Sequence, residues 1–96
     1  MFLGGWWASV VPEMQLDTGL YDAICLGQGE LTFREIVSAV ESGASLEGVA
    51  GLMLKRDGEY VRTAPRRLAG WNELLDTPWH LIDIAPYRDA QLQARP

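Results

Sequence analysis

Two glycine-containing turns are the parts of this sequence whose residue types could do chemistry. The segment Gly27-Gln28-Gly29-Glu30 follows a run of apolar residues and precedes a helix-like pattern. Backbone N–H groups of such a turn, at the start of a helix, can bind a phosphate. The dinucleotide fingerprint G-x-G-x-x-G is incomplete, because Thr32 stands where its third glycine would be. Glu30 would also repel a phosphate, so we favour a tight-turn role over a nucleotide site.

The second turn is the pair Gly4-Gly5, which follows a short apolar run at the N-terminus. Such a pair lets the backbone approach a ligand closely, or it only ends a strand tightly, and the pair alone does not distinguish these roles. Cys25 lies in the middle of an apolar run, which predicts a buried and unreactive thiol. His80 is the only histidine, and no cysteine lies near it in the sequence, so a complete protein metal site is not expected.

Two further pairs of residues have structural interpretations. We interpret Trp6 and Trp7 as packing residues in preference to a stacking platform. Arg66 and Arg67 predict a basic patch that is solvated or faces another domain.

The glycine turns need strands and helices to position them. Residues 1–3 and 22–26 are predicted strands, and the second should be buried on both faces because its centre is uninterrupted apolar sequence. Residues 8–16 predict a short helix that Ser9 could cap and that tolerates Pro12 in its first turn. This order of strand, glycine pair, helix, strand, glycine turn and helix is typical of a right-handed βαβα layer, so we expect an α/β fold.

The last helix of this layer is predicted at residues 31–41. Its apolar residues recur at i, i+3, i+4 and i+7, which places them on one face. The residues of this face are Phe33, Ile36, Val37 and Val40. Thr32 and Glu35 have the spacing of a capping box, and Gly43 is the expected terminator.

A hairpin is predicted next, because residues 51–56 and 59–63 flank the dipeptide Asp57-Gly58, which favours a type I′ turn. The turn predicts the cross-strand pairs Leu54–Val61, Leu52–Thr63, Met53–Arg62 and Lys55–Tyr60. An isolated hairpin is marginal in water, so it should lie against something larger. The sequence from residue 64 onward, with a short turn at 71–75, has no sustained period and predicts an extended connector whose apolar residues pack on a neighbouring domain.

The composition narrows the class of protein. The chain has 96 residues and a net charge of −5, which argues against nucleic acid as a partner. No apolar run approaches the roughly 20 residues of a membrane span. A single cysteine excludes an internal disulfide and suits a reducing compartment, so we expect a cytoplasmic protein.

Three blocks of the sequence carry a family resemblance that covers roughly residues 3–88. The first block is Leu3-Gly4-Gly5-Trp6 followed by Val11-Pro12-Glu13, and the second is Gly27-Gln28-Gly29-Glu30-x-Thr32-Phe33. The third block comprises Leu46-x-x-Val49-x-Gly51-Leu52, the hairpin and residues 75–87. In this order the blocks resemble the last part of a cobalamin-binding domain fused to a radical S-adenosylmethionine enzyme, the group that includes anaerobic magnesium-protoporphyrin ester cyclases and many methyltransferases.

The resemblance implies a flavodoxin-like (Rossmann-like) parallel sheet that holds the corrinoid cobalamin. Gly4 and Gly5 would line its nucleotide tail, with Gly27, Gly29 and Glu30 near the same carboxyl edge, where open α/β sheets bind ligands. Residues 1–45 would then be the C-terminal part of that domain, with about two parallel strands, residues 46–64 the hairpin, and residues 65–96 a linker to the radical domain. In that domain a [4Fe–4S] cluster would cleave S-adenosylmethionine, while cobalamin carries a methyl group or assists an oxidation.

The chain also departs from the family pattern. It lacks the cobalamin motif D-x-H-x-x-G and the cluster motif C-x-x-x-C-x-x-C, and one cysteine cannot hold a cluster. Some relatives carry histidine and proline after Gly-Gly-x, where this chain has Trp7 and Ala8. We therefore expect an inert fragment that needs further N-terminal strands and the radical domain, or a partner protein that supplies them. The alternatives are a stand-alone adaptor that docks through its hairpin and Trp-rich tail, or a small phosphate-binding domain at residues 27–30.

Overall fold

The computed structural model describes residues 1–74 and 76–93, so Leu75 and residues 94–96 of the predicted linker lie outside the described residues. The helices and strands are β1 (Phe2–Leu3), α1 (Trp6–Val10), α2 (Pro12–Asp17), β2 (Ala23–Cys25), α3 (Glu30–Ser42), β3 (Leu52–Arg56), β4 (Glu59–Arg62) and α4 (Ala85–Gln93). Short 3₁₀ turns occur at Leu46–Gly48, Trp71–Glu73 and Trp79–Leu81. The expected α/β class is confirmed.

The four strands form one mixed sheet in the order β1-β2-β3-β4. β1 and β2 are parallel, as predicted, with Phe2 opposite Ala23. β3 pairs antiparallel with β2, and β4 antiparallel with β3. The hairpin therefore extends the sheet, which satisfies the backbone groups along β2 that would otherwise be buried without partners. The division of the chain at residues 45 and 64 stays a prediction.

The hairpin has the predicted register. Leu54 lies opposite Val61, with Met53–Arg62 and Lys55–Tyr60 as the neighbouring pairs. Asp57 and Gly58 both have positive φ, 50° and 80°, as a type I′ turn requires. Local turn chemistry is therefore sufficient to set the pairing of β3 with β4.

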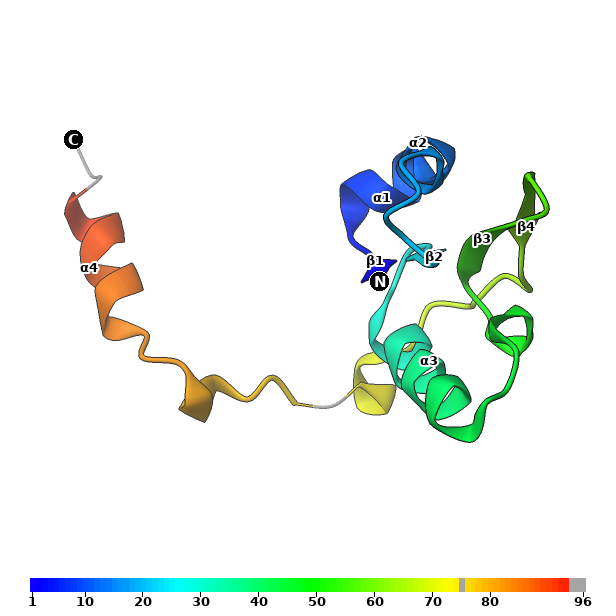
Figure 1. The fold of residues 1–96 in the computed structure, drawn as a ribbon. Coiled ribbons are helices and arrows are strands. Elements are labelled where there is room, and N and C mark those ends of the chain that lie inside the picture. The colour runs from blue at the N-terminus through cyan, green and yellow to red at the C-terminus, as the bar shows by residue number, and fades with distance from the viewer. Residues whose placement is uncertain (75, 94–96) are drawn as a thin grey trace.

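Helices cover both faces of the sheet (Figure 1), and alternate strand residues supply a core on each face. The core under α3 comprises Ala23, Cys25, Ile36, Ala39, Val49, Leu52 and Leu54. The core under α1 and α2 comprises Ala8, Leu16, Ile24 and Met53. Burial of β2 on both faces confirms the prediction from its apolar run.

The predicted apolar face of α3 is wrong in part. Ile36 is buried at 1% exposure, but Phe33, Val37 and Val40 are 58%, 40% and 60% exposed. The face that meets the sheet consists of Thr32, Ile36 and Ala39. Small residues on this face allow the helix to lie close to the strands, and the larger apolar residues point away.

The predicted capping box of α3 is also wrong. The helix begins at Glu30 with Gly29 as its N-cap, so Thr32 lies inside the first turn. The buried Thr32 hydroxyl lies 3.4 Å from the Gln28 carbonyl, and Glu35 pairs with Arg66. At the other end the prediction is confirmed, because Gly43 is left-handed with φ 70°.

The first helical segment is two helices, whereas one was predicted. The chain bends at Val11 (φ −130°, ψ 56°), and Pro12 is the first residue of α2. A proline inside a continuous helix would clash with the preceding turn, so the break lies directly before it. Ser9 lies within α1 and does not cap a helix.

After β4 the chain first lies beside α3, where Arg66 pairs with Glu35, and beyond the 3₁₀ turn Trp71–Glu73 it runs away from the sheet (Figure 1). The radius of gyration is 16.9 Å, whereas a compact chain of this length has about 12.5 Å. This segment was predicted as an extended connector, but it contains the helix α4, which the sequence pattern did not predict. Among the described residues, no helix is long and apolar enough to cross a membrane.

Candidate functional site

The two glycine turns meet at one edge of the sheet. They follow the carboxyl ends of β1 and β2, which are parallel neighbours. The Ser9 hydroxyl joins them, because it donates to the Gly5 carbonyl at 2.9 Å and accepts from the Gly27 N–H at 2.9 Å. This single side chain fixes the spacing of both turns.

A hollow of about 530 Å³ opens beside the joined turns and is called the glycine hollow below. Its lining residues are Gly5, Trp6, Ser9, Val10, Gly27, Gln28 and Leu68. Backbone and small polar groups contribute one part of the lining, and apolar side chains the rest. Trp6 is 87% exposed and Trp7 is 63% exposed, so the interpretation of this pair as core packing residues is wrong.

The glycines at this edge differ in what a side chain would meet. Gly5 and Gly27 have φ of 98° and 74°, and a Cβ there would contact nothing within 4 Å. A Cβ on Gly4 would instead lie 3.4 Å from the Cβ of Cys25. Gly4 therefore packs against β2, whereas Gly5 and Gly27 present bare backbone next to open space.

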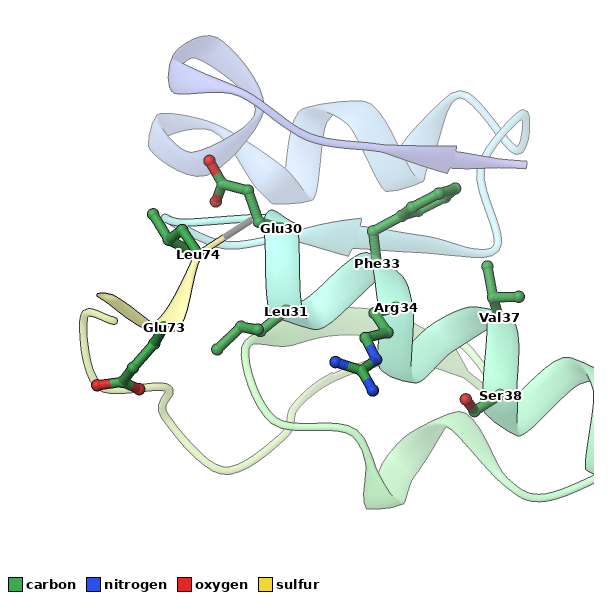
Figure 2. Close-up of a pocket in the computed structure, with 8 residues that line it drawn as sticks. All are labelled: Glu30, Leu31, Phe33, Arg34, Val37, Ser38, Glu73 and Leu74. Carbon is green, nitrogen blue, oxygen red and sulfur yellow. The ribbon is translucent and has the colours of Figure 1, made fainter. Parts of the chain in front are cut away.

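The other two predicted site residues, Gly29 and Glu30, do not line the glycine hollow. Gly29 caps α3, and Glu30 starts it. Glu30 borders a different hollow of about 460 Å³ on the outer side of α3. Figure 2 shows Phe33 and Val37 projecting from the same side of α3 at the hollow that Glu30 borders. Whether all five predicted glycine and glutamate positions contact a cofactor stays a prediction.

The first residues of the connector are hydrogen-bonded to the second glycine turn and to α3. The Gln28 side-chain oxygen accepts the Ala69 N–H at 2.7 Å, which holds Leu68 at the rim of the glycine hollow. Arg66 pairs with Glu35 of α3 and donates to the Ala50 carbonyl at 3.2 Å. The Arg66 side chain is only 14% exposed, so of the two roles predicted for Arg66 and Arg67 the solvated one does not hold for Arg66, whereas Arg67 is 74% exposed.

Ser9 and Gln28 are the side chains at this edge that the sequence pattern did not select as site residues. Ser9 stands four residues after Gly5, and a serine at that spacing can bond back to the carbonyl one helical turn earlier. That spacing is the signal that could have identified it. The contacts with Gly27 and Ala69 cross 18 and 41 residues, and no local signal reports them.

Neither Cys25 nor His80 lines the glycine hollow. Cys25 is buried, and burial raises the pKa of its thiol, as expected for an unreactive cysteine. His80 is exposed in the 3₁₀ turn of the connector. Within residues 1–74 and 76–93, no group of three histidine, cysteine or carboxylate residues is placed to hold a metal ion.

Comparisons with known proteins give two curated relatives. Over 67 residues the chain is 37% identical to an uncharacterized methyltransferase of Pyrococcus horikoshii, which covers 69% of this chain and 15% of that protein. Over 66 residues it is 29% identical to the anaerobic magnesium-protoporphyrin IX monomethyl ester cyclase of Synechocystis, which covers 69% of this chain and 13% of that protein. No family model and no solved structure matches the chain. The chain thus corresponds to a small part of each relative.

Proposed function

We propose that this chain is part of a cobalamin-dependent radical S-adenosylmethionine enzyme of the methyltransferase or cyclase type, and that it contributes part of the corrinoid-binding domain. Its similarity to a methyltransferase and to an anaerobic cyclase supports an enzyme of the radical S-adenosylmethionine class. The observation that carries the corrinoid assignment is the meeting of Gly5 and Gly27 at the carboxyl edge of two parallel strands.

The residues of the glycine hollow fit the nucleotide tail of a corrinoid. The backbone at Gly5 and Gly27 lies open, so an extended ligand can lie against it without meeting a side chain. Ser9 holds the two turns together, and the exposed side chains of Trp6 and Val10 offer a ligand an apolar surface on one side. Bound cobalamin would carry a methyl group or assist an oxidation, while these residues only bind and orient its tail.

The iron–sulfur cluster does not fit this chain. Cys25 is the only cysteine, and it is buried between two strands. A [4Fe–4S] cluster is held by several cysteine thiolates, so we assign the cluster and S-adenosylmethionine to another part of the enzyme.

The edge of the sheet at β1 supports the proposal that further strands complete the domain. Among the residues that the structure describes, β1 has a partner on one side only, in the sheet order β1-β2-β3-β4. The apolar residues Phe33, Val37 and Val40 of α3 are exposed and could pack on added strands. Parallel sheets are normally covered on both faces, so such strands would lie under this part of the helix.

Corrinoid titration of the 96-residue chain tests the proposal. Hydroxocobalamin is followed by its absorption spectrum and compared with cobinamide, which has the corrin ring without the nucleotide tail. We expect cobalamin to bind more tightly, and Gly5→Val and Gly27→Val to weaken that binding. Gly19→Val is the matched control, because Gly19 also has positive φ in open space but lies outside the hollow.

Three results would contradict the proposal. The first is equal affinity for cobalamin and cobinamide, and the second is no binding of either. The third is reconstitution of the isolated chain with iron and sulfide into a cluster that cleaves S-adenosylmethionine.

A further inference from the structure

A second hollow at the same edge of the sheet lies beside the hairpin and is called the arginine hollow below. It has a volume of about 460 Å³. Its lining residues are Leu26, Gly51, Arg62, Thr63, Pro65 and Arg66. Two of these are arginines and none is acidic. Each arginine has a carboxylate beside it outside the lining, Glu35 at Arg66 and Glu13 at Arg62.

Arg66 is held firmly in this lining. Its Nη2 group donates hydrogen bonds to a Glu35 carboxylate oxygen and to the Ala50 carbonyl. Its Nε group is buried, and within the described part of the chain it has no hydrogen-bond partner. A buried donor without an acceptor is destabilising and rare, which indicates a site whose polar groups are not fully satisfied by the protein.

Gly51 makes room for this arrangement. A Cβ on Gly51 would lie 3.2 Å from the Cβ of Arg66 and 3.6 Å from its Nε. The φ of Gly51 is 81°, so its backbone also requires glycine. Close approach of the arginine to the backbone at Gly51 therefore depends on the missing side chain.

Arg62 supplies the second charge from β4. Its Nη2 lies 3.9 Å from a Glu13 oxygen, which is at the limit for an ion pair, and its side chain is 59% exposed. Its guanidinium is therefore held by one weak contact and is open to solvent. A buried and an exposed guanidinium together suit a group with several oxygen atoms.

We propose that the arginine hollow binds a phosphate group of a ligand that lies along the carboxyl edge of the sheet. The planar N–H forks of arginine match phosphate oxygens, and paired guanidinium groups neutralise its charge. Leu26 lines this hollow and Gly27 lines the glycine hollow, so one ligand can reach both. This phosphate site does not depend on which cofactor binds in the glycine hollow. It lies at a different place from the phosphate site considered at the start of α3.

Titration with inorganic phosphate tests this site without any corrinoid. Amide resonances of the 96-residue chain are followed by NMR, with acetate and chloride at matched ionic strength for comparison. We expect saturable shifts at Gly51 and Thr63 with phosphate. Arg62→Gln should weaken binding about tenfold, as expected for loss of a charge-assisted hydrogen bond.

Arg88→Gln is the matched control, because it removes the same charge from an exposed residue in α4. It should leave phosphate affinity unchanged within about twofold. Arg66→Lys keeps a charge opposite Glu35 while removing the fork, and it should also weaken phosphate binding. Absence of saturable shifts, equal binding of acetate, or equal effects of the Arg62 and Arg88 substitutions would overturn the assignment. Loss of phosphate binding with intact cobalamin binding would leave the proposed function standing.

Discussion

The sheet with its helices and the connector after Ala64 both contain many apolar residues, but they use them differently. In the sheet region these residues alternate along the strands and fill two cores. In the connector, large apolar side chains such as Trp71, Trp79 and Leu81 are exposed. Apolar residues therefore contribute to stability only where strands and helices place them on a shared face that is buried. The connector's apolar side chains contribute little to this fold and are available to another surface.

The same substitution in the two regions tests this comparison most strongly. Leu54 is fully buried, whereas Leu81 is 75% exposed. Leu54→Ala should lower the free energy of unfolding by about 2–5 kcal/mol, because it removes buried surface and leaves a cavity. Leu81→Ala should change it by less than about 0.5 kcal/mol. Urea unfolding followed by circular dichroism measures both, and similar losses would show that the connector belongs to the cooperative core.

The close contact between Gly51 and the first residues of the connector gives the second test. Gly51 donates its N–H to the Ala64 carbonyl at 2.8 Å, and a Cβ there would press on Thr32 and Arg66 at 3.1 and 3.2 Å. Gly51→Ala should therefore cost about 1–3 kcal/mol from backbone strain together with crowding. Gly19→Ala, with a similar φ but open space, should cost less. Equal unfolding midpoints for the two variants would mean that Arg66 moves aside without cost.

The features that could be predicted from sequence are those decided locally. The hairpin register depends on Asp57 and Gly58, and the end of α3 on Gly43, each of which requires positive φ. The meeting of the glycine turns at one carboxyl edge was an implication of the family resemblance, and it agrees with the place where open α/β sheets bind ligands. These predictions needed no knowledge of distant contacts.

The features that could not be predicted depend on tertiary packing. Periodicity identified an apolar face on α3, but it could not tell that Thr32 and Ala39 would meet the sheet while Phe33 stays exposed. The antiparallel pairing of β3 with β2 joins segments whose order along the chain does not specify it. Gln28 is recognised as a site residue only when its bond to Ala69 is seen.

That bond gives the third test, because it is a link between the sheet region and the connector. Gln28→Ala removes the acceptor of the Ala69 N–H and should lower stability by about 0.5–1.5 kcal/mol. The larger effect should be local, with faster hydrogen exchange at Ala69 and unchanged exchange in β3. Gln15→Ala on α2 is the matched control and should leave the Ala69 amide protected. Protection that survives in Gln28→Ala would show that other contacts hold the connector.

Two exposed acid–base pairs, one in each region, give the smallest expected effect. Asp17 accepts hydrogen bonds from Tyr60 at 2.5 Å and Lys55 at 2.9 Å, which ties α2 to the hairpin. The bond from Tyr60, followed by that from Lys55, holds the pKa of Asp17 below its ordinary value of 3.8. In the connector, Arg67 lowers the pKa of Glu73 below 4.5, but this pair spans only 6 residues.

A lowered carboxyl pKa stabilises the folded state above the ordinary value, and this contribution is lost as pH falls through the folded value. Asp17→Asn should therefore lower the urea midpoint near neutral pH, and its difference from the wild type should vanish well below pH 3.8. Glu73→Gln should match the wild type at every pH, because the contact it removes lies within the connector and does not join it to the sheet. A larger effect of Glu73→Gln than of Asp17→Asn would reverse the contrast between the two regions.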